Sequence, residues 1–214
     1  MIAMDATDPN GWHPFSPSAA QNAAPIFDQL LPRLAPGSRV FEIGSGTGQH
    51  AVHACTRRAD LVWQPSERPE ALSALRDNLE RHTTPGVQPA IAYDTQTPLA
   101  AWPPLDAVYT TNTLHIMPPA AVAALFASLT DMLQPEQAFY SYGPFRFPSR
   151  PPVASNEAFD ASLRRDNPDQ GVRSIDWLNA LAADACVTLE EALEMPSNNH
   201  LLIWRRFAPS SNSI

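Results

Sequence analysis

The chain has 214 residues, of which 44% are hydrophobic and 17% are charged, a composition typical of a globular domain and unlike that of disordered chains. All 14 basic residues are arginine, which excludes a Schiff-base lysine and a Walker lysine. The net charge of −8 and the lack of clustered basic residues argue against binding to nucleic acid or to an anionic membrane, so we expect a small-molecule partner.

The first half of the chain predicts alternating helices and strands. Apolar residues recur at helical spacing in three segments, and short runs of β-branched and aromatic residues lie between them. We therefore expect helices over residues 21–34, 49–58 and 69–82, and strands over residues 39–43, 61–63 and 89–93. The second of these strands is expected to end near Ser66 and Glu67.

The second half continues this alternation. Residues 146–173 are rich in proline, asparagine and arginine around a short helical stretch at 157–165, which predicts a cap or an insertion. The last two strands flank a turn-like sequence at 196–199, so we expect them to pair antiparallel. The predicted strands cover residues 105–110, 138–142, 187–193 and 201–204, and the remaining helices cover 118–133 and 174–185.

The alternation predicts one α/β domain over residues 1–214. We expect a Rossmann-like fold, with a seven-stranded, mainly parallel sheet, helices on both faces and an antiparallel C-terminal strand pair. Ligands of such folds bind at the carboxyl ends of the strands. The glycine-rich turn at residues 44–48, which follows the first strand, is therefore the expected place of the site.

The two cysteines and the N-terminal sequence bear on metal binding and location. Cys55 and Cys186 lack C-x-x-C spacing, so we expect no zinc site, no disulfide framework and no metal cofactor. Residues 1–12 lack the regions of a signal peptide, and no stretch approaches a membrane span. These features predict a cytoplasmic protein that does not bind membranes, and we expect a monomer or a homodimer.

The spacing of the glycine turn indicates the class of cofactor. Residues 41–48 read F-E-I-G-S-G-T-G, whereas a dinucleotide site needs G-x-G-x-x-G, with a glycine where Gln49 stands. An oxidoreductase that uses NAD or FAD is therefore disfavoured. The E-x-G-x-G-x-G arrangement resembles the first motif of class I S-adenosylmethionine-dependent methyltransferases, which implies S-adenosylmethionine as cofactor and S-adenosylhomocysteine as product.

Acidic residues follow the next two strands, where that resemblance expects them. Glu67 can accept hydrogen bonds from both ribose hydroxyls, and Asp94 from the adenine amino group. The alternative for each carboxylate is a solvated strand end or a helix cap. The predicted cofactor-binding residues are Glu42, Gly44, Gly46, Gly48, Glu67, Asp94 and Asn112.

A wider set of motifs resembles one family within this superfamily. The motifs are FSPSAA at 15–20 followed by Asn22, WQPS at 63–66, NTLHI at 112–116, YGPF at 142–145, SNEAFDASL at 155–163, GVR at 171–173 and MPSNN at 195–199. Together they are similar to the methyltransferase-like protein 26 family, also called domain-of-unknown-function family 938, over residues 15–206. The resemblance implies the fold and the cofactor. The chain departs from the family pattern at Gln21, Glu67 and Arg146, where Arg, Asp and Lys are expected, so substrate identity does not carry over.

Polar residues after the fourth and fifth strands are the candidates for chemistry. His115 is predicted to act as a general base, because its ordinary pKa suits a proton acceptor at neutral pH, and Tyr142 to line or donate into the acceptor pocket. The alternatives are a histidine that only packs at a strand end and a tyrosine that only walls a turn. The predicted substrate-binding residues are Asn22, Asn156, Arg173, Asn198 and Asn199.

Two of these substrate candidates have structural alternatives. Arg173 is close in sequence to Asp166, Asp169 and Asp176, which are possible ion-pair partners. The asparagines at 198 and 199 are also typical of a turn. Residues 15–22 and 146–173 lie outside the strand–helix alternation, and we expect them to form a lid over the acceptor pocket.

The function predicted from these features is S-adenosylmethionine-dependent methyl transfer, EC class 2.1.1, to an unidentified small molecule. The alternative is a non-catalytic module of the same fold that binds S-adenosylmethionine or S-adenosylhomocysteine in regulation or interaction, because fold does not fix function. Methylation of a protein or of tRNA is a further alternative, but the chain lacks the basic surface that nucleic acid needs. The Asn/Asp-Pro-Pro-Tyr/Phe motif of amino-group methyltransferases is replaced by Thr111-Asn112-Thr-Leu.

Overall fold

A computed structural model describes residues 11–97, 99 and 102–208 of the chain. The expectation about a signal peptide falls mostly on residues 1–10, which lie outside the described residues. The chain divides into two compact units, unit 1 over residues 1–99 and unit 2 over residues 100–214. We describe each unit by itself.

The first helix of unit 1, α1 (Pro17–Leu30), begins four residues before its predicted start. Ser16 is its N-cap, with the Oγ atom accepting a hydrogen bond from the Ala19 N–H at 3.2 Å, and proline is well suited to the first helical turn. A 3₁₀ turn over Leu31–Arg33 follows the helix. The helix buries the face formed by Ala23, Ile26, Phe27 and Leu30.

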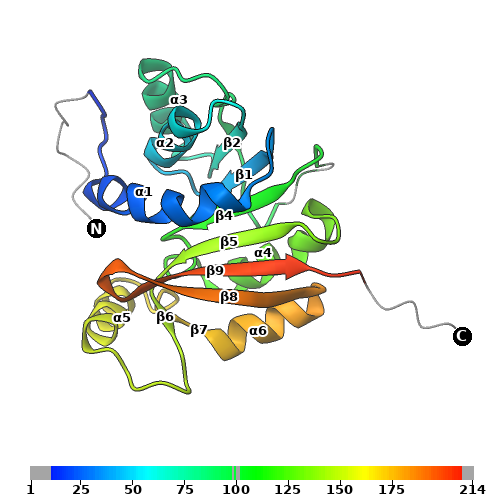
Figure 1. Cartoon of the computed structure of the whole chain (residues 1–214). Coiled ribbons are helices and arrows are strands. Elements are labelled where there is room, and N and C mark those ends of the chain that lie inside the picture. The colour runs from blue at the N-terminus through cyan, green and yellow to red at the C-terminus, as the bar shows by residue number, and fades with distance from the viewer. Residues whose placement is uncertain (1–10, 98, 100–101, 209–214) are drawn as a thin grey trace, which may run out of the picture. The chain divides into compact units, whose positions relative to one another are not determined.

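Three parallel strands form the sheet of unit 1, in the order β3-β2-β1. Helices α2 and α3 alternate with these strands and pack beside β2 (Figure 1). Strand β1 has its predicted bounds, and β2 ends at Glu67, close to its predicted end near Ser66 and Glu67. The elements are β1 (Arg39–Ile43), α2 (Gln49–Arg57), β2 (Val62–Glu67), α3 (Leu72–Arg81) and β3 (Ile91–Ala92).

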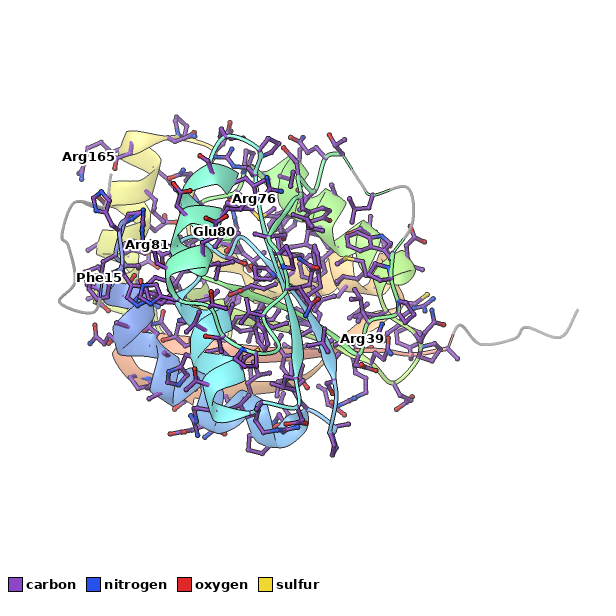
Figure 2. All side chains as sticks on the ribbon, turned by 90° about the horizontal axis from the view of Figure 1, so that it is seen from above. Phe15, Arg39, Arg76, Glu80, Arg81 and Arg165 are labelled. Atoms are coloured by element: carbon purple, nitrogen blue, oxygen red, sulfur yellow. The ribbon has the colours of Figure 1, made fainter. Side chains whose placement is uncertain are left out.

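Helix α3 has one apolar and one charged side. Leu72 and Leu75 are buried against Ala90, as the helical spacing of the leucines predicts. Figure 2 labels Arg76, Glu80 and Arg81, which extend from the same helix. Arg81 also reaches the N-terminal segment, where its guanidinium donates a hydrogen bond to the His13 carbonyl oxygen at 3.2 Å.

Unit 2 contains four strands in the order β4-β5-β9-β8. Strands β4 and β5 are parallel, and β9 pairs antiparallel with both β5 and β8, which confirms the predicted C-terminal pair. Helix α6 lies along β8 (Figure 1). The elements are β4 (Ala107–Thr111), α4 (Pro119–Met132), β5 (Ala138–Gly143), α6 (Ile175–Asp184), β8 (Val187–Met195) and β9 (Asn199–Arg206), with a 3₁₀ turn over Pro196–Asn198.

The core of unit 2 is aromatic. Phe126 of α4 meets Phe139 of β5 and Trp204 of β9 edge to face, with ring centroids 5.7 Å and 5.3 Å apart. Such pairs are more favourable than face-to-face stacking and fix the helix against the sheet. The indole N–H of Trp204 donates to Ser141 Oγ at 3.0 Å, so this buried polar group has a partner.

The predicted cap at 146–173 contains one helix, α5 (Ala154–Asp166), which is longer than the stretch expected from its sequence. Two strands of two residues each, β6 (Phe145–Arg146) and β7 (Arg173–Ser174), pair parallel at its ends. Strands this short leave no alternating pattern in the sequence, so they were not predicted.

The fold class is α/β and Rossmann-like, as predicted. Seven strands form a mainly parallel sheet with an antiparallel C-terminal pair, and helices lie around it. Within the described residues, the helices are too short or too polar for any of them to span a membrane.

Candidate functional site

The carboxyl edge of unit 1 brings three predicted residue groups together. Ile43 at the end of β1 is in register with Ser66 of β2, and Glu67 is in register with Ala92 of β3. The glycine turn, the end of β2 and the loop holding Asp94 therefore lie at one edge of the sheet. This is the edge where ligands of such folds bind.

The glycine turn has a conformation that other residues rarely adopt. Gly44, Gly46 and Gly48 have φ values of 68°, 56° and 83°, in the region that favours glycine. A Cβ atom added at Gly46 would meet no atom within 4 Å, whereas one at Gly48 would lie 2.8 Å from Leu79 Cδ2 of α3. Gly46 therefore faces open space, and Gly48 permits close packing of the turn on α3.

Glu67 holds the glycine turn directly. Its Oε2 atom accepts a hydrogen bond from the Gly46 N–H at 2.9 Å, and Oε1 accepts one from the Arg68 N–H at 2.9 Å. A carboxylate oxygen has two acceptor sites. Each oxygen of Glu67 thus keeps one site for a further donor, such as a ribose hydroxyl.

Glu42 supports the same turn from inside unit 1. The residue is only 2% exposed, and its Oε2 atom accepts hydrogen bonds from Ser45 Oγ and Trp63 Nε1, each at 2.9 Å. Burial raises the pKa of Glu42 to about 7, against the opposing effect of these two hydrogen bonds. The structure thus joins Glu42 to a side chain of the turn and not to the open face beside Gly46.

Ser66 completes the attachment of the turn to β2. Its Oγ donates to the Glu42 carbonyl oxygen at 2.6 Å, its N–H donates to Ser45 Oγ at 3.1 Å, and its carbonyl oxygen accepts from the Ser45 N–H at 2.9 Å. Sequence reasoning missed Ser45, Trp63 and Ser66 as site residues. The available signal was the WQPS string at 63–66, which contains Trp63 and Ser66.

The N-terminal segment is tied to the glycine turn by two polar side chains that sequence reasoning also missed. Asn78 of α3 is fully buried, and its Nδ2 donates to the carbonyl oxygens of Pro14 at 3.0 Å and Thr47 at 3.1 Å. Its Oδ1 accepts from the His13 N–H at 3.0 Å. Figure 2 shows Phe15, which follows these residues, near Arg81 of the same helix.

Gln49 makes a second link between the same segments. Its Oε1 accepts from the Ser16 N–H at 2.7 Å and from Thr47 Oγ1 at 2.8 Å, and its Nε2 donates to the Ser16 carbonyl oxygen at 3.2 Å. Asn22 lies half-buried on α1. In the described part of unit 1, His13, Pro14 and Ser16 are the residues of this segment that bond to Asn78 and Gln49.

Asp94 occupies a tight turn after β3. Its Oδ1 accepts from the Gln96 N–H at 2.9 Å, and its carbonyl oxygen accepts from the Thr97 N–H at 2.9 Å. This is the local bonding typical of an aspartate in a turn. The side chain is half-buried at the same edge as Glu67.

In unit 2 the structure brings Asn112, His115 and Tyr142 together. The Asn112 N–H donates to the Tyr142 carbonyl oxygen at 2.8 Å. A Cβ atom added at Gly143 would lie 3.7 Å from His115 Nδ1 and 3.8 Å from Asn112 Oδ1. Asn112 has a φ of 54°, a conformation that asparagine tolerates better than most residues.

Burial decides the ionisation of His115 and Tyr142. His115 lies edge-on to Phe159, with ring centroids 5.1 Å apart. Burial, together with the positive charge of Arg173, lowers the pKa of His115 to about 4. Burial likewise raises the pKa of Tyr142 above its ordinary value. At neutral pH the histidine is therefore uncharged and the tyrosine keeps its proton.

Arg173 is buried and uses its guanidinium on backbone oxygens. Nε donates to the Leu114 carbonyl oxygen at 3.0 Å, and Nη2 donates to that of Asp169 at 2.8 Å and to that of Met117. These bonds hold the turn that follows β4, on which His115 lies. Arg173 therefore has a structural role, which was the alternative to substrate binding. Its acceptors among the described residues are backbone carbonyl oxygens and not the aspartate side chains expected from the sequence.

The three remaining asparagines lie together in unit 2. Asn156 Nδ2 donates to the Asn198 carbonyl oxygen at 3.1 Å, Asn198 Nδ2 donates to Ser155 Oγ at 3.0 Å, and Asn199 Nδ2 donates to the Pro196 carbonyl oxygen at 3.2 Å. Asn156, Asn198 and Asn199 line a cavity of about 360 Å³ between α5 and the β8–β9 turn. Their bonds shape the turn, and their position also places them at a cavity.

No group of three or more His, Cys, Asp or Glu side chains in the described ranges is placed to hold a metal ion. Both cysteines are free. Burial raises the pKa of the Cys55 thiol to about 12, which leaves it unreactive at neutral pH.

Solved structures with a similar fold include methyltransferases. The mitomycin 7-O-methyltransferase MmcR has a TM-score of 0.75 and 16% identity, over 88% of this chain and 54% of that one. An O-methyltransferase family 2 protein from Planctomyces limnophilus in complex with apigenin has a TM-score of 0.73 and 18% identity, over 88% and 60%. Human N-acetylserotonin methyltransferase in complex with S-adenosylmethionine has a TM-score of 0.73 and 12% identity, over 89% and 53%.

These identities establish a shared fold. The chain spans about half the length of the first of these matching structures. At the level of sequence, residues 13–206 match the family described as "Protein of unknown function (DUF938)". The chain belongs to the DUF938 family.

Proposed function

We propose that the protein is an S-adenosylmethionine-dependent methyltransferase of EC class 2.1.1 that acts on a small molecule. The observation that carries this proposal is the carboxyl edge of unit 1, where the open glycine Gly46 is bonded to the strand-end carboxylate Glu67. The fold shared with solved methyltransferases supports it. The resemblance to methyltransferase-like protein 26 supports the same function and stays a prediction.

The residues present fit the proposed cofactor. The open side of Gly46 admits an aminoacyl group close to the backbone. The free acceptor sites of Glu67 suit the two ribose hydroxyls, and the carboxylate of Asp94 suits the adenine amino group. Glu42 acts as a positioning residue through Ser45. When bound, S-adenosylmethionine supplies a methyl group on a positively charged sulfur.

The residues at the ends of β4 and β5 are proposed to serve the acceptor. As the acceptor atom bonds to the methyl carbon and the carbon–sulfur bond breaks, a hydroxyl or amine acceptor must lose a proton. Neutral His115 can take this proton, and protonated Tyr142 can donate a hydrogen bond to the acceptor. Asn112 orients this cluster through its bond to the Tyr142 backbone.

A non-catalytic binding module is the second candidate. The observation that favours it is the low pKa of His115, about 4, because a group with so low a pKa is a weak base at neutral pH. In this case the same carboxyl edge binds S-adenosylmethionine or S-adenosylhomocysteine in order to regulate the protein or a partner.

Native mass spectrometry and calorimetry test the proposal. We expect the purified chain to carry, or to bind on titration, S-adenosylmethionine or S-adenosylhomocysteine. The protein is then incubated with a metabolite extract and a labelled methyl donor, and label that appears in a compound of the extract shows methyl transfer. Binding with transfer supports the methyltransferase, binding without transfer in any fraction favours the module, and failure of a folded chain to bind either compound overturns both.

A further inference from the structure

The cavity of unit 2 has mostly apolar walls. Its lining residues come from β6, α5, the β8–β9 turn and the segments beside them, and its volume of about 360 Å³ is within the range of small-molecule pockets. A rigid ligand suits an apolar cavity of this size, because a rigid molecule loses little conformational freedom on binding. The apolar residues include Phe145, Phe147, Pro151, Pro152, Val153 and Met195.

One wall residue, His200, has ring nitrogens that lack hydrogen-bond partners. The side chain is 9% exposed, and both Nδ1 and Nε2 are buried without a partner among the described residues. Its ring lies against Phe147, with centroids 4.5 Å apart. A buried polar atom without a partner is unfavourable, so a ligand that bonds to His200 would remove part of that penalty.

The charges of the cavity wall are already compensated. Arg146 donates to Glu157 through Nε at 3.1 Å and through Nη2 at 2.9 Å and 3.0 Å, and Arg150 donates to Glu194 at 2.8 Å. Burial and the charge of Arg150 lower the pKa of His200, which keeps the ring neutral at neutral pH. A charged ligand would lose its hydration without gaining a free counter-charge.

We propose that this cavity binds a neutral aromatic molecule with one hydroxyl or N–H group, such as a phenol, through a hydrogen bond to His200. A neutral imidazole has one donor and one acceptor nitrogen, so it can accept the ligand's proton in a hydrogen bond. The identification of this ligand with the methyl acceptor rests on the proposed function. Its binding does not, because the cavity lies within unit 2.

Three probe molecules of similar size test the recognised chemistry on the full chain without cofactor. These are 4-methylphenol, toluene, which lacks the hydroxyl, and benzoate, which carries a charge. We expect 4-methylphenol to bind with amide chemical-shift changes at Phe147 and His200 in NMR spectra. Because one hydrogen bond contributes roughly 0.5 to 1.5 kcal/mol, toluene should bind about twofold to tenfold more weakly, and benzoate more weakly still.

His200→Phe keeps a ring of similar size but removes both nitrogens. It should abolish the preference for 4-methylphenol over toluene, whereas the control His53→Phe, which removes a half-buried histidine of unit 1, should leave it unchanged. His200→Gln should retain part of the preference, and it serves as the second variant if His200→Phe fails to fold.

Equal binding of 4-methylphenol and toluene to the wild type, stronger binding of benzoate, or no binding of any probe overturns the inference. The same samples are titrated with S-adenosylhomocysteine. A chain that binds 4-methylphenol but not S-adenosylhomocysteine contradicts the proposed function alone, and the reverse result contradicts this inference alone.

Discussion

The carboxylate of Glu67 accepts a hydrogen bond from the backbone N–H of Gly46, with 2.9 Å between Oε2 and N. The last residue of β2 thereby holds the middle glycine of the turn that follows β1. Glu67 therefore has two roles under the proposed function. It shapes the glycine turn in the protein itself, and it offers its remaining acceptor sites to the ribose.

Glu67→Ala should weaken S-adenosylhomocysteine binding about tenfold to a hundredfold, because charge-assisted hydrogen bonds contribute roughly 1.5 to 3 kcal/mol. Isothermal titration calorimetry measures the change. Glu70→Ala is the matched control, since Glu70 is an exposed acid three residues away that pairs with Arg68. A loss under twofold in a folded Glu67→Ala variant would remove Glu67 from the cofactor site.

Gly46→Val should abolish cofactor binding, because the new side chain occupies the open side of the turn and its φ of 56° is unfavourable for valine. Gly37→Val separates these two effects. Gly37 also has a positive φ, 75°, and open space around it, but it lies at the opposite end of β1. The control variant should lose stability while retaining affinity, and equal affinity of both variants would contradict the assignment.

Asn78→Ala should loosen the N-terminal segment and the glycine turn together, because the amide bonds to both Pro14 and Thr47. Hydrogen exchange of residues 13–22 and 44–48 should accelerate in the variant.

The lid prediction concerns the wild type. S-adenosylhomocysteine should slow hydrogen exchange in residues 15–22, and the lid prediction extends this slowing to residues 146–173. Exchange that is identical with and without ligand in both segments would eliminate the lid.

Glu42 should make stability fall as pH rises. Its pKa in the folded chain, about 7, is above its ordinary value of 4.5, so the folded state binds the proton more tightly. The benefit is complete below about pH 4.5 and is lost as pH rises through 7, a change on the order of 3 kcal/mol. Urea unfolding at about pH 5 and pH 8 measures it.

Glu42→Gln should remove this component of the pH dependence while the amide oxygen still accepts from Trp63. Glu70→Gln, at an exposed position, should leave the dependence as it is in the wild type. If Glu42→Gln and the wild type show the same change between the two pH values, the carboxyl group of Glu42 does not carry the proton that we assign to it.

His115 should not titrate near neutral pH. Its lowered pKa, about 4 against an ordinary value of 6.5, means that the folded ring stays neutral above pH 4. Its contribution to stability is complete above about pH 6.5 and is lost as pH falls from there through 4. Its ring signals in NMR spectra, assigned with His115→Gln, should not shift between about pH 5.5 and 8. If His115 is the base, the acid limb of kcat/KM lies near pH 4. A midpoint near 6.5 would show that the ring is solvated and would contradict the geometry.

Local signals in the sequence predict some elements well and others poorly. Strand β1 matches its predicted bounds because a β-branched and aromatic run ends at Gly44, where the backbone must turn. Helix α1 begins at Pro17, four residues early, because apolar periodicity does not register a Ser16 cap. The pair β6 and β7 depends on contacts between segments far apart in the chain, which no local pattern contains.

The site shows the same division between local and tertiary information. The resemblance predicted that Glu42, Glu67 and Asp94 bind the cofactor, and their strand-end positions predicted that they lie at the sheet edge of the glycine turn. The burial of Glu42 against Trp63 depends on packing between strands, and so does the raised pKa. His200 was missed because a single histidine in a strand has no special signal, and its unpartnered nitrogens follow only from its surroundings.

The position of Asn78 has a practical consequence for work on the purified protein. Its amide connects the backbone at residues 13 and 14 with the glycine turn at Thr47. An affinity tag or fusion partner attached ahead of residue 13 would lie close in sequence to these hydrogen bonds and would be expected to disturb them. Affinities for the cofactor should therefore be measured after cleavage of any N-terminal tag. A difference in affinity between cleaved and uncleaved protein would show that the N-terminal segment affects the glycine turn through Asn78.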